Sequence, residues 1–96
     1  MKISWSELAE SDFRYNTQFL IKEWDLNVIQ DFNDEVERII GILPEFPTAF
    51  QKHKKRNIHF VPITKQITLY YRVYRSAIIL LKFWNTYQNP RKVKFK

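Results

Sequence analysis

His59 is the side chain in this sequence best suited to proton transfer, and three later residues could complete a reaction centre around it. A histidine can gain or lose its proton near neutral pH, so it can serve as a general base or a proton donor. Arg72 and Lys82 would stabilise charge on a phosphate group, and Tyr87 would stack on a base. The candidate catalytic residues are therefore His59, Arg72, Lys82 and Tyr87, which combine a group able to transfer a proton with cations for a phosphate and a ring for a base. A lone histidine on a strand is nevertheless more often a surface or hydrogen-bonded residue.

The composition excludes several other kinds of reaction centre. Gly41 is the only glycine, so no glycine-rich loop can hold a nucleotide phosphate. Two isolated histidines make no recognisable zinc site when the chain has no cysteine. Without cysteine the chain can form no disulfide framework either. We therefore expect neither a metal ion nor a cofactor.

Charge is unevenly divided along the chain. The first 48 residues hold all 10 Asp and Glu, whereas residues 49–96 hold twelve of the 16 Lys and Arg and no acid. A basic half of this kind favours a phosphate backbone or an acidic protein as a partner, although a solvated basic surface is the simpler alternative. The candidate residues for binding a partner or a nucleic acid are Lys54, Lys55, Arg56, Asn85 and Arg91.

The spacing of apolar residues predicts the elements that must position these side chains. Alternation predicts a strand over 2–5, and Ser6 is a suitable N-cap for a helix in which Asn16 interrupts the apolar stripe. A second helix begins near Asp25 or Asn27 and ends before Pro44. The period then changes to two and predicts strands over 57–63, 67–74 and 77–84, with a tight turn at 75–76.

These elements predict an α+β fold of order β-α-α-β-β-β. Two amino-terminal helices with apolar stripes must cover one face of an antiparallel sheet. With 45% hydrophobic and 17% aromatic residues in 96 positions, the chain should form a single domain over 1–96, whose basic tail at 89–96 frays unless a partner orders it.

The alternation of side chains along strands predicts which candidates lie together. His59, Thr68 and Arg72 have the opposite parity to four residues expected in the core, namely Ile58, Phe60, Leu69 and Tyr71. We therefore expect His59 and Arg72 on the face turned away from the helices. Lys82, Asn85 and Tyr87 would reach the same face from the end of the adjacent strand.

Four segments, spread over nearly the whole length of the chain, carry a resemblance to a known family. They are Ile3 to Ser6 with Ala9, Asp12 and Phe13; Ile39 to Pro44 with Pro47; Ile67 to Val73; and Ile78 to Leu81. In order and spacing these segments resemble the RelE/ParE superfamily of type II toxin-antitoxin toxins, and Phe83 to Pro90 falls where that family has its closing basic segment. The resemblance implies a small growth-inhibiting toxin, of the kind linked to plasmid stabilization, that is neutralised by a cognate antitoxin.

The chain departs from the family at the positions that carry catalysis. RelE-like members cleave mRNA at the ribosome without a metal, using cations on the second and third strands and near the chain end. At the matching positions this chain has His59, Val61, Thr68 and Tyr87, and a histidine of other nuclease members falls on Asn85. The resemblance therefore leaves two hypotheses: a rearranged endoribonuclease site, or inhibition of DNA gyrase by binding, as in ParE-like members. A third hypothesis is a non-toxic, basic nucleic-acid-binding module with the same fold.

The partners expected follow from the charge and the resemblance. The antitoxin should be acidic where it meets the basic half, with carboxylates aimed at Arg56, Arg72 or Lys82. The cellular target would be the ribosome with its mRNA, or DNA gyrase. We expect no membrane association and a cytoplasmic location, because the longest uninterrupted apolar run is Ala77 to Leu81 and early acids interrupt any apolar leader.

Overall fold

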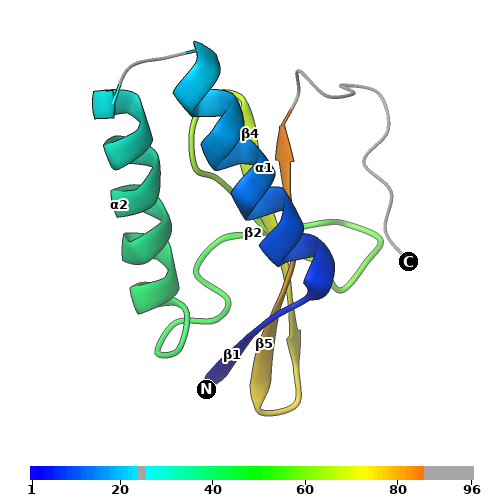
Figure 1. Ribbon diagram of the computed structural model, residues 1–96. Coiled ribbons are helices and arrows are strands. Elements are labelled where there is room, and N and C mark those ends of the chain that lie inside the picture. Colours follow the sequence, from blue (N-terminus) through cyan, green and yellow to red (C-terminus); the bar gives the residue numbers. More distant parts are fainter. Residues whose placement is uncertain (24–25, 86–96) are drawn as a thin grey trace.

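The computed structural model describes residues 1–23 and 26–85 as one strand, two helices and four further strands (Figure 1). The elements are β1 (Lys2–Trp5), α1 (Glu7–Glu23), α2 (Leu26–Ile42), β2 (Gln51–Lys52), β3 (His59–Pro62), β4 (Ile67–Tyr74) and β5 (Ala77–Asn85). The predicted order is confirmed, with one addition: β2 is a two-residue strand inside the basic cluster that precedes β3. Such a short pairing leaves too little periodic pattern to be detected in the sequence.

Ser6 separates β1 from α1 and contacts both the helix and the sheet. Its Oγ accepts a hydrogen bond from the backbone N–H of Ala9 (3.0 Å), as an N-cap does. The same hydroxyl donates to the carbonyl of Leu81 in β5 (3.0 Å). Ser6 is therefore the predicted N-cap, and it also fastens the start of α1 to the sheet.

The second helix matches its predicted stripe and its predicted end. Phe32, Val36 and Ile39 are buried along α2. The helix stops at Ile42, two residues before Pro44, because a proline ring cannot continue the hydrogen-bonded backbone. Its start at Leu26 falls between the two predicted caps, of which residue 25 lies outside the described part of the chain.

The α+β class and the single helical layer are confirmed, but the sheet is mixed rather than antiparallel throughout. The strand order is β1-β5-β4-β3-β2, and β1 runs parallel to β5 while the other pairs are antiparallel. Both helices lie on the same side of this sheet (Figure 1). The direction of β1 depends on how the two helices return the chain, and periodicity does not report that.

The hairpin between β4 and β5 contains two irregularities that shape the sheet. Arg75 has a φ of 53° in the predicted tight turn, where a left-handed residue matches the twist of the strands. Further along, the register shifts so that Tyr71 pairs with Leu80 and Tyr70 with Lys82, which leaves Leu81 as the extra residue of a β-bulge. The bulge changes the alternation of β5, so Leu80 and Phe83 both face the helices.

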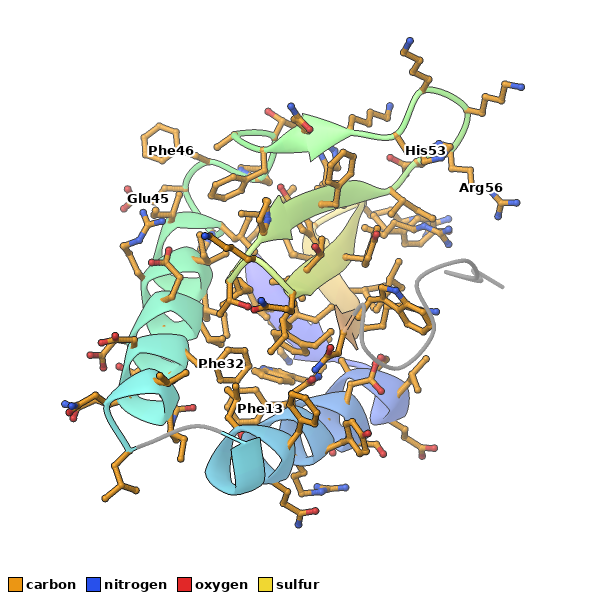
Figure 2. The ribbon with its side chains drawn as sticks, turned by 90° about the horizontal axis from the view of Figure 1, so that it is seen from above. Phe13, Phe32, Glu45, Phe46, His53 and Arg56 are labelled. Atoms are coloured by element: carbon orange, nitrogen blue, oxygen red, sulfur yellow. The ribbon has the colours of Figure 1, made fainter. Side chains whose placement is uncertain are left out.

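Aromatic rings fill the space between the helices and the sheet. The ring of Phe83 lies 5.5 Å from that of Trp5, 5.6 Å from that of Phe13 and 6.4 Å from that of Phe32, measured between centroids. Phe13 and Phe32 lie close together between α1 and α2 (Figure 2). The buried hydrophobic residues of both helices and of β4 and β5, together with Val61 of β3, belong to one hydrophobic cluster. Among the described residues, no helix is long and apolar enough to cross a bilayer.

Candidate functional site on the outer face of the sheet

The predicted position of His59 is wrong: it faces the helices. His59 pairs with Tyr71 and Phe60 with Tyr70, which places Phe60 rather than His59 on the face turned away from the helices. The imidazole is 5% exposed and stacks on the ring of Tyr71 at 5.1 Å between centroids. We call the face turned away from the helices the outer face, and His59 does not belong to it.

The alternation along β3 could not decide this orientation, because both of its faces carry apolar side chains. Val61 and Ile63, which share the parity of His59, are the residues that enter the hydrophobic cluster. His59 follows them inward, and its Nδ1 donates to the carbonyl oxygen of Phe50 at 3.2 Å. A carbonyl can only accept, so this bond fixes the proton on Nδ1 and satisfies a polar atom within the core.

Tyr71 lies beside His59 and gives a pH-dependent prediction. Its hydroxyl donates to the carbonyl of Pro47 (3.0 Å), and burial raises its pKa from 10.0 to about 12, opposed by a hydrogen bond with the backbone of Phe50. Above pH 10 the Tyr71 phenol ionises in the unfolded chain but stays protonated in the folded protein, and this favours unfolding. The free energy of unfolding should therefore fall as the pH rises from 10 to 12.

The Tyr71→Phe variant should lack this alkaline loss. Near pH 8 it should be less stable than the wild type by about 1 kcal/mol, because one hydrogen bond is missing. By pH 11.5 the wild type should have lost on the order of 2 kcal/mol through this group, and the order of the two proteins should reverse. Urea unfolding at both pH values measures the difference, and an unchanged difference would contradict the raised pKa.

The outer face combines two of the predicted cations with aromatic rings. Its members on adjacent strands are Phe60, Tyr70 and Lys82 across one row of the sheet, Thr68 and Trp84 across another, and Arg72 with Ile79 across a third. Arg72 and Lys82 thus face away from the helices as predicted. Rows two residues apart on a strand are about 7 Å apart, so the two cations lie on adjacent rows of neighbouring strands.

The ring of Trp84 lies beside Lys82 on this face. Its Nζ lies 5.6 Å from the centroid of the Trp84 ring, a cation–π distance. Only 8% of the residue is exposed, and the removal of water lowers its pKa, while the charge of Asp12 opposes that shift. Burial likewise raises the pKa of Tyr70, its partner in the register. Arg72 is half-buried and donates from Nε to the carbonyl of Asn57 (3.2 Å).

Asp12 is a contributor to this site that the sequence analysis did not single out for function. Its carboxylate accepts the backbone N–H of Phe83 at 3.2 Å, on the edge of β5 beyond the end of β1. Burial raises its pKa, and the hydrogen bond from Phe83 and the charge of Lys82 both act to lower it. Asp12 therefore replaces a missing strand at this edge and places a negative charge near Lys82. The Asp12-Phe13 pair in the sequence gave no indication of such a contact.

Asn85 does not reach the outer face, which corrects another expectation. It pairs with Ile67, whose side chain is in the core, and it is completely buried. Its Nδ2 donates to Oδ1 of Asn16 (2.9 Å), and Nδ2 of Asn16 donates to the carbonyls of Asp12 (2.9 Å) and Phe83 (3.2 Å). The polar residue on the apolar stripe of α1 is thus explained by a buried amide pair.

The remaining candidates fall into two groups. Lys54, Lys55 and Arg56 are exposed in the loop between β2 and β3, where Figure 2 shows the side chain of Arg56 pointing away from the sheet. This loop borders an open depression lined by Gln51, Lys52, His53, Lys54, Lys55 and Phe60. Tyr87 and Arg91 lie outside the described residues. Within the described residues no group of three or more potential metal-ligating side chains occurs.

Comparisons with known proteins rest on structure alone. No protein-family model and no curated protein matches the sequence. The chromosomal ParDE TA system from P. aeruginosa has a chain that superposes with a TM-score of 0.73 at 11% identity, covering 88% of this chain and 95% of that one. The YoeB/ParE toxin from Agrobacterium tumefaciens superposes at 0.63 with 16% identity, over 88% and 98% of the two chains. A copper-bound mutant toxin from Helicobacter pylori superposes with a TM-score of 0.63 at 18% identity, covering 93% of this chain and 98% of that one.

The chain accordingly has the RelE/ParE-like toxin fold. The match extends over most of its length, and the same two helices followed by strands recur in structures whose sequences are 11% to 18% identical to this one. The resemblance inferred from sequence segments is confirmed at the level of the fold. What the fold does in this chain depends on the side chains described above.

Proposed function

We propose that this protein is the toxin of a toxin-antitoxin system, acting in the cytoplasm and neutralised by a cognate antitoxin. The observation that carries the proposal is the superposition on a ParDE chain over 88% of this chain with a TM-score of 0.73. The charge pattern supports it as well, since twelve cations and no acid in residues 49–96 favour an acidic antitoxin.

We propose further that the outer face contacts the cellular target. Arg72 and Lys82 lie there together with Phe60, Tyr70 and Trp84. Cations next to aromatic rings are the combination that binds phosphates and stacks bases, which favours mRNA on the ribosome as the target.

A second candidate is inhibition of DNA gyrase by binding. The observation that favours it is the position of His59, whose ring is stacked in the core and hydrogen-bonded to Phe50. A nuclease site built on His59 would have its imidazole in the core rather than on the surface that meets a substrate, whereas a binding inhibitor needs no such group. Cleavage would then have to rely on Lys82, Tyr70 or residues beyond 85.

Induced expression in bacteria tests the toxin role directly. We expect growth to stop when the chain is expressed alone and to continue when the small gene beside it in its own genome is expressed with it. Unaffected growth despite abundant folded protein would contradict the proposal and leave the non-toxic nucleic-acid-binding module as the better account.

Two further measurements on the arrested cells separate the targets. Cleaved mRNA with normal plasmid supercoiling would support the ribosome as the target. Altered supercoiling and induction of the DNA-damage response with intact mRNA would support gyrase. Growth arrest through gyrase, without any cleavage step, would also agree with the buried position of His59.

A further inference from the structure

The loop between β2 and β3 holds a dense group of cations in a fixed conformation. Lys52, Lys54, Lys55 and Arg56 are exposed, and none makes an ion pair with another residue of the described chain. The loop closes through a hydrogen bond from His53 N–H to the Ile58 carbonyl (2.8 Å) and one from Lys55 N–H to Nδ1 of His53 (3.2 Å). The positive charges are therefore presented together without compensation by nearby acids.

The base of the same loop is tied to β4. Nδ2 of Asn57 donates to the carbonyl of Val73 (3.2 Å), and Nε of Arg72 donates to the carbonyl of Asn57 (3.2 Å). These two bonds join the loop to the row of the sheet that carries Arg72. A ligand on the loop would consequently be held next to the outer face.

An aromatic ring forms part of the depression beside these cations. Phe60 is half-buried, lines the depression with Lys52, His53, Lys54 and Lys55, and its centroid lies 6.1 Å from that of Tyr70. A nucleotide presents a flat base and an anionic phosphate. The Phe60 ring matches the base, and the lysines match the phosphate. An acidic peptide would pair its carboxylates with the lysines but would offer no flat apolar group to pack against the Phe60 ring.

We propose that the depression between β2 and β3 binds single-stranded nucleic acid, with a base against Phe60 and the flanking phosphates on Lys52, Lys54 and Lys55. Binding is independent of sequence, because every base has a flat face and every nucleotide has a phosphate. A duplex binds less well, since its bases are already stacked on one another. The inference does not rest on the toxin role: a chain without effect on growth can still bind a single strand.

Fluorescence anisotropy of the purified 96-residue chain with labelled 12-nucleotide oligo(U) and oligo(dT) tests this site across a salt series. The Lys54→Ala/Lys55→Ala variant should bind at least about 10-fold more weakly at low salt, and its log-log salt slope should fall by about 1.4, which is two phosphate contacts on a single strand. The matched control is Lys2→Ala/Lys65→Ala, which removes two exposed lysines from elsewhere and should keep the wild-type slope.

The aromatic contact is tested separately. Phe60→Leu keeps an apolar side chain, so it should fold, yet it should weaken binding about 5-fold or more at every salt concentration without changing the slope. Circular dichroism confirms that each variant is folded. Equal binding to oligo(U) and oligo(dT) means that the shared backbone and base faces suffice, and a preference for oligo(U) means that the 2′-hydroxyl adds a contact; both agree with the site.

Three results would overturn the proposal. They are equal losses in the two double variants, unchanged affinity in folded Phe60→Leu, and binding of a 12-residue polyglutamate or a 12-base-pair duplex as tight as that of the single strands. The polyglutamate result would assign the loop to an acidic protein partner. All of these readouts are independent of growth arrest, so failure here leaves the toxin proposal intact.

Discussion

Growth arrest by this protein should be lost when Lys82 is replaced by methionine. Lys82 is the least exposed cation of the outer face, held near Trp84 and the negative charge of Asp12, so its charge sits in a poorly hydrated place. A cation in such a place interacts strongly with an anionic target, and its removal should cost about 2–5 kcal/mol of target binding. Methionine keeps the length and the apolar contacts of the side chain. Colony counts after induction measure the result.

The exposed Lys65 supplies the matched control. Lys65→Ala also removes one positive charge, but from the turn between β3 and β4, and it should remain as toxic as the wild type. Arg72→Ala should behave like Lys82→Met, because the two cations share the outer face. Thermal unfolding of each purified variant excludes a folding defect as the cause. Full toxicity of stable Lys82→Met and Arg72→Ala would remove the outer face from the proposed function.

Phe83→Ala should lose about 3–5 kcal/mol of unfolding free energy, the largest stability effect that we expect. The ring is completely buried and packs against Trp5, Phe13 and Phe32, so its removal leaves a cavity where both helices meet the sheet. The backbone bonds from residue 83 to Asp12 and Asn16 do not depend on the side chain. For a chain of this size the melting temperature should fall by at least about 12 °C.

Phe46→Ala makes the same chemical change at an exposed ring. Phe46 is 61% exposed in the segment after α2, and Figure 2 shows it pointing away from the core. Its replacement should change stability by no more than about 0.5 kcal/mol. Similar losses at positions 46 and 83, measured by urea unfolding at neutral pH, would show that the aromatic cluster is not the core of the fold.

The local features of this fold follow from the sequence alone. A stripe of apolar residues with a helical period predicts α2, Pro44 predicts where it stops, and Ser6 predicts where α1 starts. The hairpin turn at 75–76 is equally local. These features depend on interactions between residues close in the chain, and such interactions are legible in spacing and residue type.

The candidate site was only partly predictable. The parity of β4 correctly placed Arg72 on the outer face, because Leu69 and Tyr71 on the opposite parity are much more apolar than their alternates. The parity of β3 failed for His59 and Phe60. On that strand both faces carry apolar residues, so alternation states that two faces exist without stating which one meets the helices.

Only the tertiary structure decided the contacts that tune the site. Asp12 and Lys82 are 70 positions apart, and Asn16 and Asn85 are 69 apart; each pair meets because α1 covers the edge of β5 where β1 ends. The bulge at Leu81 likewise depends on how β4 and β5 pair. The sequence by itself determines the elements, the basic half and the choice of candidate cations. Which side chains become buried, paired or exposed is set by long-range packing, because a residue's environment is made by distant parts of the chain that no local pattern records.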